Sequence, residues 1–236
     1  MASRAVPGRI PEGYIGCVTQ PTSPATPVTR AQQERYDRVI AAMEEALSAG
    51  GLESVQMKDL AQRAGVSLAT LYRYFPSKEY LLLAVALARY QAAARKVLAE
   101  VPRGNTVRER VTGHLMREFR TQQREQRLTA ALTLALTGTA RSDSAIIETV
   151  EHLHLRILSH VAAGGGQLTE QQQKILSIVL DIFRGATRRW LAGTFSAADA
   201  QFQIEAGCEL LELSDDVVDA ELERAAPDVA IRRASP

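Results

Sequence analysis

The 236-residue sequence contains little sulfur and few aromatic rings: two cysteines, one tryptophan and 5% aromatic residues in total. Cys17 and Cys208 stand near opposite ends, so their spacing fits neither a disulfide framework nor a metal-ligand motif. Isolated cysteines of this kind are typical of proteins in a reducing compartment. We therefore expect a cytoplasmic protein without structural disulfides.

Several functional classes lack their sequence signatures. No window approaches the eighteen uncharged apolar residues of a membrane span, and no apolar segment near the N-terminus resembles a secretory signal. The histidines include no i, i+4 pair, which argues against a zinc site. The glycine run at 164–166 follows an expected helix, whereas a phosphate-binding loop follows a strand. We predict no membrane association, no catalytic residue, no metal and no cofactor.

The expected helix-turn-helix region has no excess of positive charge, which a nucleic-acid-binding protein often shows. Residues 30–80 carry seven basic and seven acidic side chains, although 95–127 carry nine basic against four acidic ones. The last segment, 196–236, reverses this balance with three arginines against ten carboxylates. Charge therefore gives no independent support for DNA binding, and any such function has to be argued from geometry.

The residues that are abundant indicate an all-α protein. Apolar residues make up 46% of the chain, alanine and leucine dominate, and alternating β-branched runs are few. Five of the nine prolines lie in residues 1–28, which we expect to form a disordered arm. We divide the remainder into a helix-turn-helix domain at 29–76, a C-terminal helical domain at 77–213, and an acidic, partly disordered tail at 214–236.

The stretch from Met57 to Lys78 organises the chain. Apolar residues at Met57, Leu60 and two following alanines match one face of a short helix, which ends at Gly65. Gly65 can take a positive φ, and Ser67 can cap a second helix from Leu68 to Tyr74. A helix, a tight turn and a second helix in this spacing predict a helix-turn-helix motif.

The second helix leaves polar and small residues on its open side, as a helix in a DNA groove requires. Short side chains near its start permit close approach to bases, and Arg and Tyr at its flanks can hold phosphates. On this pattern the predicted DNA contacts are Ser67, Leu68, Ala69, Thr70, Tyr72, Arg73 and Tyr74. The alternative is a helical protein-interaction module without DNA-binding activity, in which the tyrosines are half-buried.

The sequence T-L-Y-R-Y-F-P-S-K at 70–78, after A-x-R-A-G-V-S at 61–67, resembles the DNA-binding domain of TetR-type bacterial repressors. The resemblance covers roughly residues 30 to 90. Val-Gln-Met at 55–57 and the C-terminal half are similar to the steroid-catabolism repressors of actinobacteria. The resemblance implies phosphate contacts by Gln56 and Lys78, a homodimer formed through the last two long helices, and an effector pocket in the C-terminal domain.

Periodic apolar residues predict further helices after Ser77, Thr106, Leu128, Ser144, Thr169 and Ser196. The last two helices have apolar residues on two faces, which favours a four-helix dimer interface containing Leu176, Val179, Phe183, Trp190, Phe202 and Leu210. We expect the pocket to be lined by Met116, Phe119, Leu132, Thr133, Leu136, Ile147, Val150 and His154. The same residues could instead form a filled helical core. The predicted effector is a largely apolar small molecule, steroid-like or an acyl-CoA thioester, that releases the protein from operator DNA.

Overall fold

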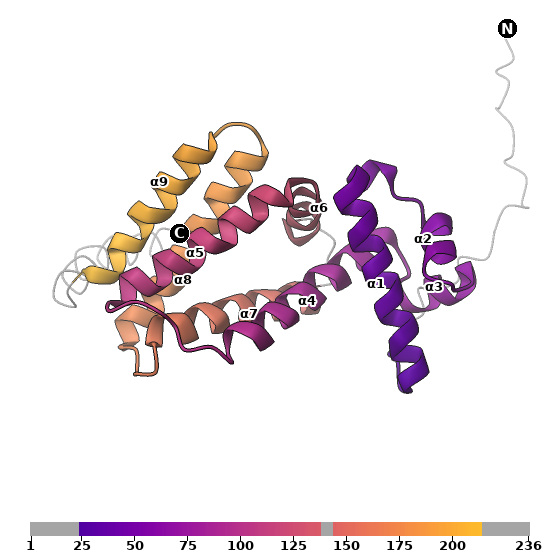
Figure 1. The fold of residues 1–236 in the computed structure, drawn as a ribbon, viewed down its shortest axis with the longest axis horizontal. Helices are drawn as coiled ribbons and strands as arrows, with labels where there is room; N and C mark the ends of the chain where they lie inside the picture. Colours follow the sequence, from indigo (N-terminus) through magenta and orange to yellow (C-terminus); the bar gives the residue numbers. More distant parts are fainter. Residues whose placement is uncertain (1–23, 138–143, 214–236) are drawn as a thin grey trace, which may run out of the picture.

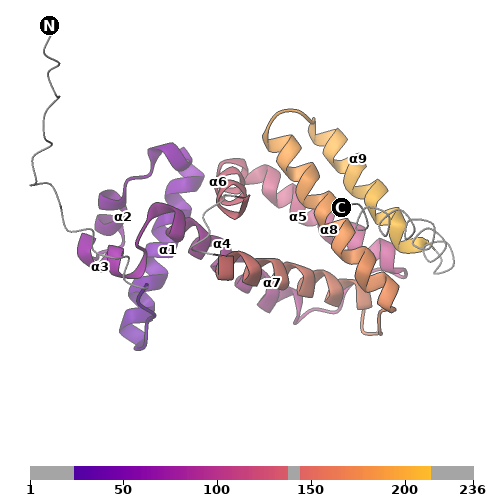
Figure 2. The same cartoon turned by 180° about the vertical axis from the view of Figure 1, so that it is seen from behind.

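The computed structural model describes residues 24–137 and 144–213, and all regular elements of these ranges are helices (Figure 1). The predicted arm and tail lie outside these ranges, apart from residues 24–28. An N-terminal group of helices stands at one end of the elongated molecule, and a larger group stands at the other (Figures 1 and 2). The all-α prediction is confirmed. In the described ranges, no helix combines the length and apolar character that crossing a membrane requires.

The N-terminal group consists of α1 (Arg30–Gly50), α2 (Met57–Arg63) and α3 (Leu68–Tyr74), with a short 3-10 turn at Leu52–Ser54. Thr29 and Gln32 form a capping box at the start of α1. Gly65 has a φ of 65°, and Ser67 accepts the N–H of Thr70 at 3.1 Å. These local devices confirm the helix-turn-helix predicted from the sequence.

Helix α4 (Lys78–Val97) begins in the N-terminal group and extends into the C-terminal one. Its first part is buried on several sides, from Leu81 to Ala86. These residues pack on α1, α6 and α7, so α4 is shared by both groups. A change in the tilt of this helix therefore moves one group relative to the other.

The C-terminal group contains α5 (Val107–Arg124), α6 (Gln126–Thr137), α7 (Ser144–Ala163), α8 (Glu170–Leu191) and α9 (Ala197–Cys208), and the chain continues in a 3-10 turn at Glu209–Glu212. Thr169 and Gln172 form a capping box at the start of α8. At Thr106 only half of the box forms, because the Glu109 carboxylate accepts the N–H of Asn105 rather than that of Thr106.

Helix α6 lies against the N-terminal helices rather than only within the C-terminal group (Figure 2). Leu128 and Ala131 belong to the same buried cluster as Met43 and Leu47 of α1. The Arg127 guanidinium also donates to the carbonyl of Ala49 at the end of α1. The core of the N-terminal group thus extends past residue 76, where the sequence suggested a boundary.

Three of the residues expected at a dimer interface have a different role. Leu176, Val179 and Phe183 are almost completely buried inside their own subunit, in the core shared by α5, α7, α8 and α9. Trp190 packs edge-on against Phe119, with ring centroids 5.3 Å apart. The prediction failed for this α8 face because its apolar stripe is already covered by α5 and α9.

The remaining two residues of that expectation lie nearer the surface. Phe202 of α9 is 73% exposed, and Leu210 is partly buried against the C-terminal core. Ile178, on the outer side of α8, is 49% exposed.

Candidate nucleic-acid interface and ligand pocket

The open face of α3 carries most of the predicted DNA contacts. Ser67, Ala69 and Arg73 are exposed, and Leu68 and Tyr72 are 40% and 45% exposed. Thr70 is half-buried, and its hydroxyl lies 2.8 Å from that of Ser67. The face therefore combines small residues and hydroxyls near the helix N-terminus with a phenol and a guanidinium further along. This combination fits the major groove, where short side chains reach bases and longer ones reach phosphates.

Tyr74 does not lie on this face, contrary to the prediction. It is 2% exposed, and its ring meets that of Tyr36 edge-on at 5.9 Å. Tyr74 follows Leu71 by three residues, so both side chains point from α3 toward α1. From outside, the Arg73 guanidinium covers the ring of Tyr74 at 5.2 Å. Tyr74 thus supports α3 from the side that faces α1.

Lys78 also differs from the expectation. Its ammonium donates to the carbonyls of Leu52 and Val55, at 2.6 and 2.9 Å. Lys78 therefore ties the start of α4 to the 3-10 turn before α2. Gln56, in contrast, is exposed at the N-cap of α2, and its side chain makes no capping bond. The resemblance implied phosphate contacts by Gln56 and Lys78. The Lys78 ammonium is bonded to backbone carbonyls, whereas the Gln56 side chain makes no such bond.

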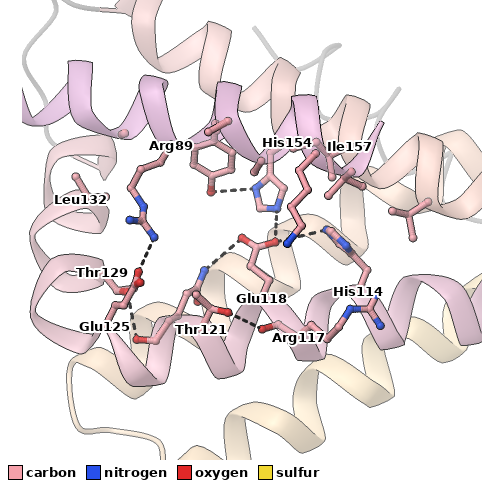
Figure 3. A pocket seen from close by; sticks show the side chains of 18 of the residues that line it. Arg89, His114, Arg117, Glu118, Thr121, Glu125, Thr129, Leu132, His154 and Ile157 are labelled. Atoms are coloured by element: carbon pink, nitrogen blue, oxygen red, sulfur yellow. Dashed lines mark hydrogen bonds and ion pairs between the residues drawn. The ribbon is translucent and has the colours of Figure 1, made fainter. Parts of the chain in front are cut away.

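A cavity of about 970 Å³ lies among α4, the α4–α5 connection, α5, α6 and α7, and Glu44 of α1 also borders it. This volume is near the upper end of the range for small-molecule sites. Helices α4 and α5 form its long walls, and side chains from both point into it (Figure 3). Its apolar lining includes Ala86, Ala93, Val97, Leu128, Ile157 and Val161.

Half of the residues predicted for a pocket line this cavity: Leu132, Thr133, Leu136 and His154. The other four do not. Met116 and Phe119 belong to the face of α5 that is buried against α8 and α9. Val150 is buried, and both Ile147 and Val150 lie toward the start of α7, whereas the α7 lining begins at His154.

The sequence prediction missed the contribution of α4. Arg89, Tyr90, Ala93, Lys96 and Val97 line the cavity. Their spacing of three and four residues along one helix face was visible in the sequence. The same spacing is also typical of a helix face packed in a core, so the pattern alone does not indicate a cavity.

A chain of hydrogen bonds crosses the cavity wall. The Tyr90 hydroxyl lies 3.3 Å from Nδ1 of His154, and Nε2 of His154 lies 3.2 Å from a carboxylate oxygen of Glu118. Gln122 donates to the other Glu118 oxygen at 3.4 Å, and His114 approaches the carboxylate at 3.9 Å. Figure 3 shows His154 and His114 on two sides of Glu118. Helices α4, α5 and α7 are thereby connected through polar groups.

The environment sets the charge of this cluster. Burial by itself would raise the pKa of Glu118, but the adjacent His154, with its hydrogen bond, and His114 outweigh burial and hold that pKa below its ordinary value. Burial lowers the pKa of His114. Burial also raises the pKa of Tyr90, and the Glu118 charge adds to the rise. At neutral pH the cluster therefore contains a carboxylate, a neutral phenol and a neutral His114.

A second polar group connects the cavity to the N-terminal helices. The Arg89 guanidinium contacts the carboxylates of Glu44 in α1 and of Glu125 between α5 and α6 (Figure 3 shows the contact to Glu125). All three side chains line the cavity and are about one third exposed. This ion-pair network joins the two helix groups at the cavity wall.

Three other cations at the cavity, Lys96, Arg103 and Arg117, have side chains without a hydrogen-bonded or carboxylate partner within the described part of the chain. Arg110, in contrast, donates to carbonyls at the end of α7 and to Gly104. The α4–α5 end of the cavity thus has positive charge available to a ligand. No cluster of metal-ligating side chains occurs in the two described ranges.

Comparison with known proteins assigns both parts of the chain. Residues 39–85 match the family described as bacterial regulatory proteins of the tetR family, and residues 104–211 match a tetracyclin repressor-like C-terminal domain. The HTH-type transcriptional repressor KstR of Rhodococcus jostii (strain RHA1) is 33% identical over 183 residues, which span 78% of this chain and 85% of KstR.

Solved structures agree with this assignment. A TetR transcriptional regulator from Rhodococcus sp. RHA1 superposes with a TM-score of 0.69 at 27% identity, covering 78% of this chain and 99% of that one. The TetR-family repressor FadR of Thermus thermophilus, solved in complex with lauroyl-CoA, has the same fold with a TM-score of 0.58 at 22% identity, covering 76% and 95% of the two chains. The chain therefore belongs to the TetR family of bacterial regulatory proteins, which are DNA-binding transcriptional regulators rather than enzymes.

Proposed function

We propose that this protein is a cytoplasmic repressor that binds operator DNA as a homodimer and leaves it when an amphipathic effector occupies the cavity. One observation carries the proposal: α4 and α6 line the cavity and also belong to the core of the DNA-binding helices. A ligand that changes the spacing of these two helices therefore changes the position of α3. The resemblance to KstR, a named repressor, supports repression rather than activation.

The DNA contacts divide by position on α3. Ser67, Leu68, Ala69 and Thr70 stand at its N-terminal end, where a recognition helix reaches base edges. Tyr72 and Arg73 lie further along and suit phosphates, as does Gln56 at the start of α2.

A two-fold dimer would present two copies of α3 to successive major grooves, about 34 Å apart. We place its interface on the outer sides of α8 and α9. Ile178 and Phe202 are exposed there, and the same two helices of a partner subunit would remove both side chains from water.

The effector class follows from the cavity lining. Alanine, valine, leucine and isoleucine side chains suit an aliphatic or polycyclic body, while Lys96, Arg103 and Arg117 suit an anionic group. The shared chemistry is that of a lipid-like or steroid-like acid or its CoA thioester. The FadR fold is compatible with such a ligand, since its structure contains lauroyl-CoA.

The Arg89 network offers a route from the cavity to the DNA. An effector in the cavity contacts the same wall that Arg89, Glu44 and Glu125 form. It can release the operator only by binding better to an arrangement in which the two α3 helices are wrongly spaced. We propose that the Arg89–Glu44 pair belongs to the operator-binding arrangement and is weakened in the effector-bound one.

The test is fluorescence anisotropy with labelled DNA from the region upstream of the protein's own gene. Arg73→Ala should weaken binding about tenfold, while Arg156→Ala, an equal charge change at an exposed site on α7, should not. Saturating dodecanoyl-CoA or dodecanoic acid should weaken operator binding about thirtyfold, the effect of a typical 2 kcal/mol coupling. Equal operator affinity for both arginine variants would refute the DNA-binding face. Unchanged affinity with every amphipathic acid would refute the effector class.

A further inference from the structure

Two hydrogen bonds join the Tyr90 phenol, the His154 imidazole and the Glu118 carboxylate in a chain. Glu118 is a carboxylate, so it only accepts, and the proton between it and His154 belongs to Nε2 of the imidazole. We assign the single ring proton of His154 to Nε2 because that nitrogen faces the carboxylate, so that Nδ1 accepts a hydrogen bond from the Tyr90 hydroxyl 3.3 Å away. Gln122 occupies the second oxygen of the carboxylate.

With this order of donors and acceptors, the chain offers the cavity a hydrogen-bond acceptor and no donor. The Tyr90 proton is used by His154, but the phenol oxygen retains lone pairs, and Tyr90 lines the cavity. His154 is 1% exposed, so water cannot replace a lost partner. If the Tyr90 hydroxyl turned its hydrogen toward a ligand, Nδ1 of His154 would lose its hydrogen bond. The nearby Glu118 carboxylate repels a second anion.

We propose that Tyr90, held by His154 and Glu118, is a specificity-determining residue that accepts a hydrogen bond from an uncharged hydroxyl group of the effector. The inference rests on the proposed function and adds a polar feature to the effector class. A ligand hydroxyl binds without breaking any bond of the chain. A ketone at the same carbon requires the Tyr90 proton and leaves His154 unpaired, so it binds less well.

The position of Tyr90 relative to the cations sets the ligand's shape. Tyr90 and Lys96 are six residues apart on α4, which places them about 9 Å apart along the helix axis. The effector should therefore carry its hydroxyl and its anionic group at separate ends of the apolar body. A twelve-carbon chain is long enough to reach both.

Three acids with one skeleton test the inference by isothermal titration calorimetry: dodecanoic, 11-hydroxydodecanoic and 11-oxododecanoic acid. The wild-type protein should bind the hydroxy acid about tenfold more tightly than the other two, as one additional hydrogen bond allows. Tyr90→Phe should abolish this preference, so that the hydroxy acid no longer binds more tightly than dodecanoic acid. Tyr36→Phe, the same change at a residue outside the cavity, should keep the preference.

The outcomes separate the two proposals. Equal wild-type affinity for all three acids would refute the hydroxyl site and leave the amphipathic effector standing, with the polar chain serving only to connect helices. Preference for the oxo acid would overturn the donor and acceptor order. Failure of all three acids to bind would refute the effector class, and the hydroxyl site with it. The wild-type comparison decides among these results even if a variant is unstable.

Discussion

A basic residue at the start of α4 can either stabilise the fold or hold a DNA phosphate, and Lys78 allows the two roles to be tested. Its ammonium donates to two backbone carbonyls, those of Leu52 and Val55. A hydrogen bond to a charged group contributes roughly 1.5 to 3 kcal/mol. Lys78→Met keeps the apolar stem and removes both bonds. Water can reach the two partly buried carbonyls and replaces part of the lost hydrogen bonding. We expect a loss of about 2 to 4 kcal/mol in the free energy of unfolding, a Tm roughly 4 to 16 °C lower.

The assay combines urea unfolding with operator binding at several salt concentrations. Lys58→Met makes the same change at an exposed residue of α2 and should alter stability by less than about 0.5 kcal/mol. At temperatures where Lys78→Met is folded, its slope of log affinity against log salt should equal that of the wild type. A slope lower by about one with unchanged stability would mean that Lys78 holds a phosphate, and the structural reasoning would be wrong.

Other predictions follow from close contacts and exposed groups. Gly207→Ala places a Cβ 3.0 Å from Cγ2 of Ile182, so unfolding in urea should show a loss of about 1 kcal/mol. Glu44→Gln removes one ion pair of the network, which should reduce the effector-induced loss of operator affinity from about thirtyfold to about fivefold, whereas exposed Glu45→Gln should not. Phe202→Glu should raise the dimer dissociation constant at least tenfold in light scattering, and unaltered mass would exclude α9 from the interface.

The helix-turn-helix could be predicted from sequence because its signals are local. A glycine with positive φ and a serine cap act within a few residues. The two tyrosines of α3 illustrate the limit. Residues two apart on a helix differ by about 200° in direction, so Tyr72 and Tyr74 cannot share a face. Only Tyr72 is exposed, and the helical period would have separated them.

The cavity depends on contacts that a single sequence does not reveal. Helix α5 has apolar residues toward α8 and polar residues toward α4, and a sequence does not say which partner covers which face. The apolar pattern therefore predicts Phe119 at the cavity, whereas the structure buries Phe119 in the core and places Glu118 at the cavity wall. Buried carboxylates appear as surface residues until their histidine partners, 36 positions away in the case of His154, are located.

The segment just before α1 determines how this protein can be handled. The N–H of Ala25 donates to the carbonyl of Arg73 at 3.0 Å, and Ala25 packs against the N-terminal core. The chain thus enters the described fold beside the last turn of α3. An affinity tag or fluorescent protein attached directly before residue 24 would be tethered next to α3 and would compete with the operator for space. Fusions and surface attachment should therefore be made after residue 213, because the last described element, Glu209–Glu212 after α9, lies at the opposite end of the molecule from α3 (Figure 1).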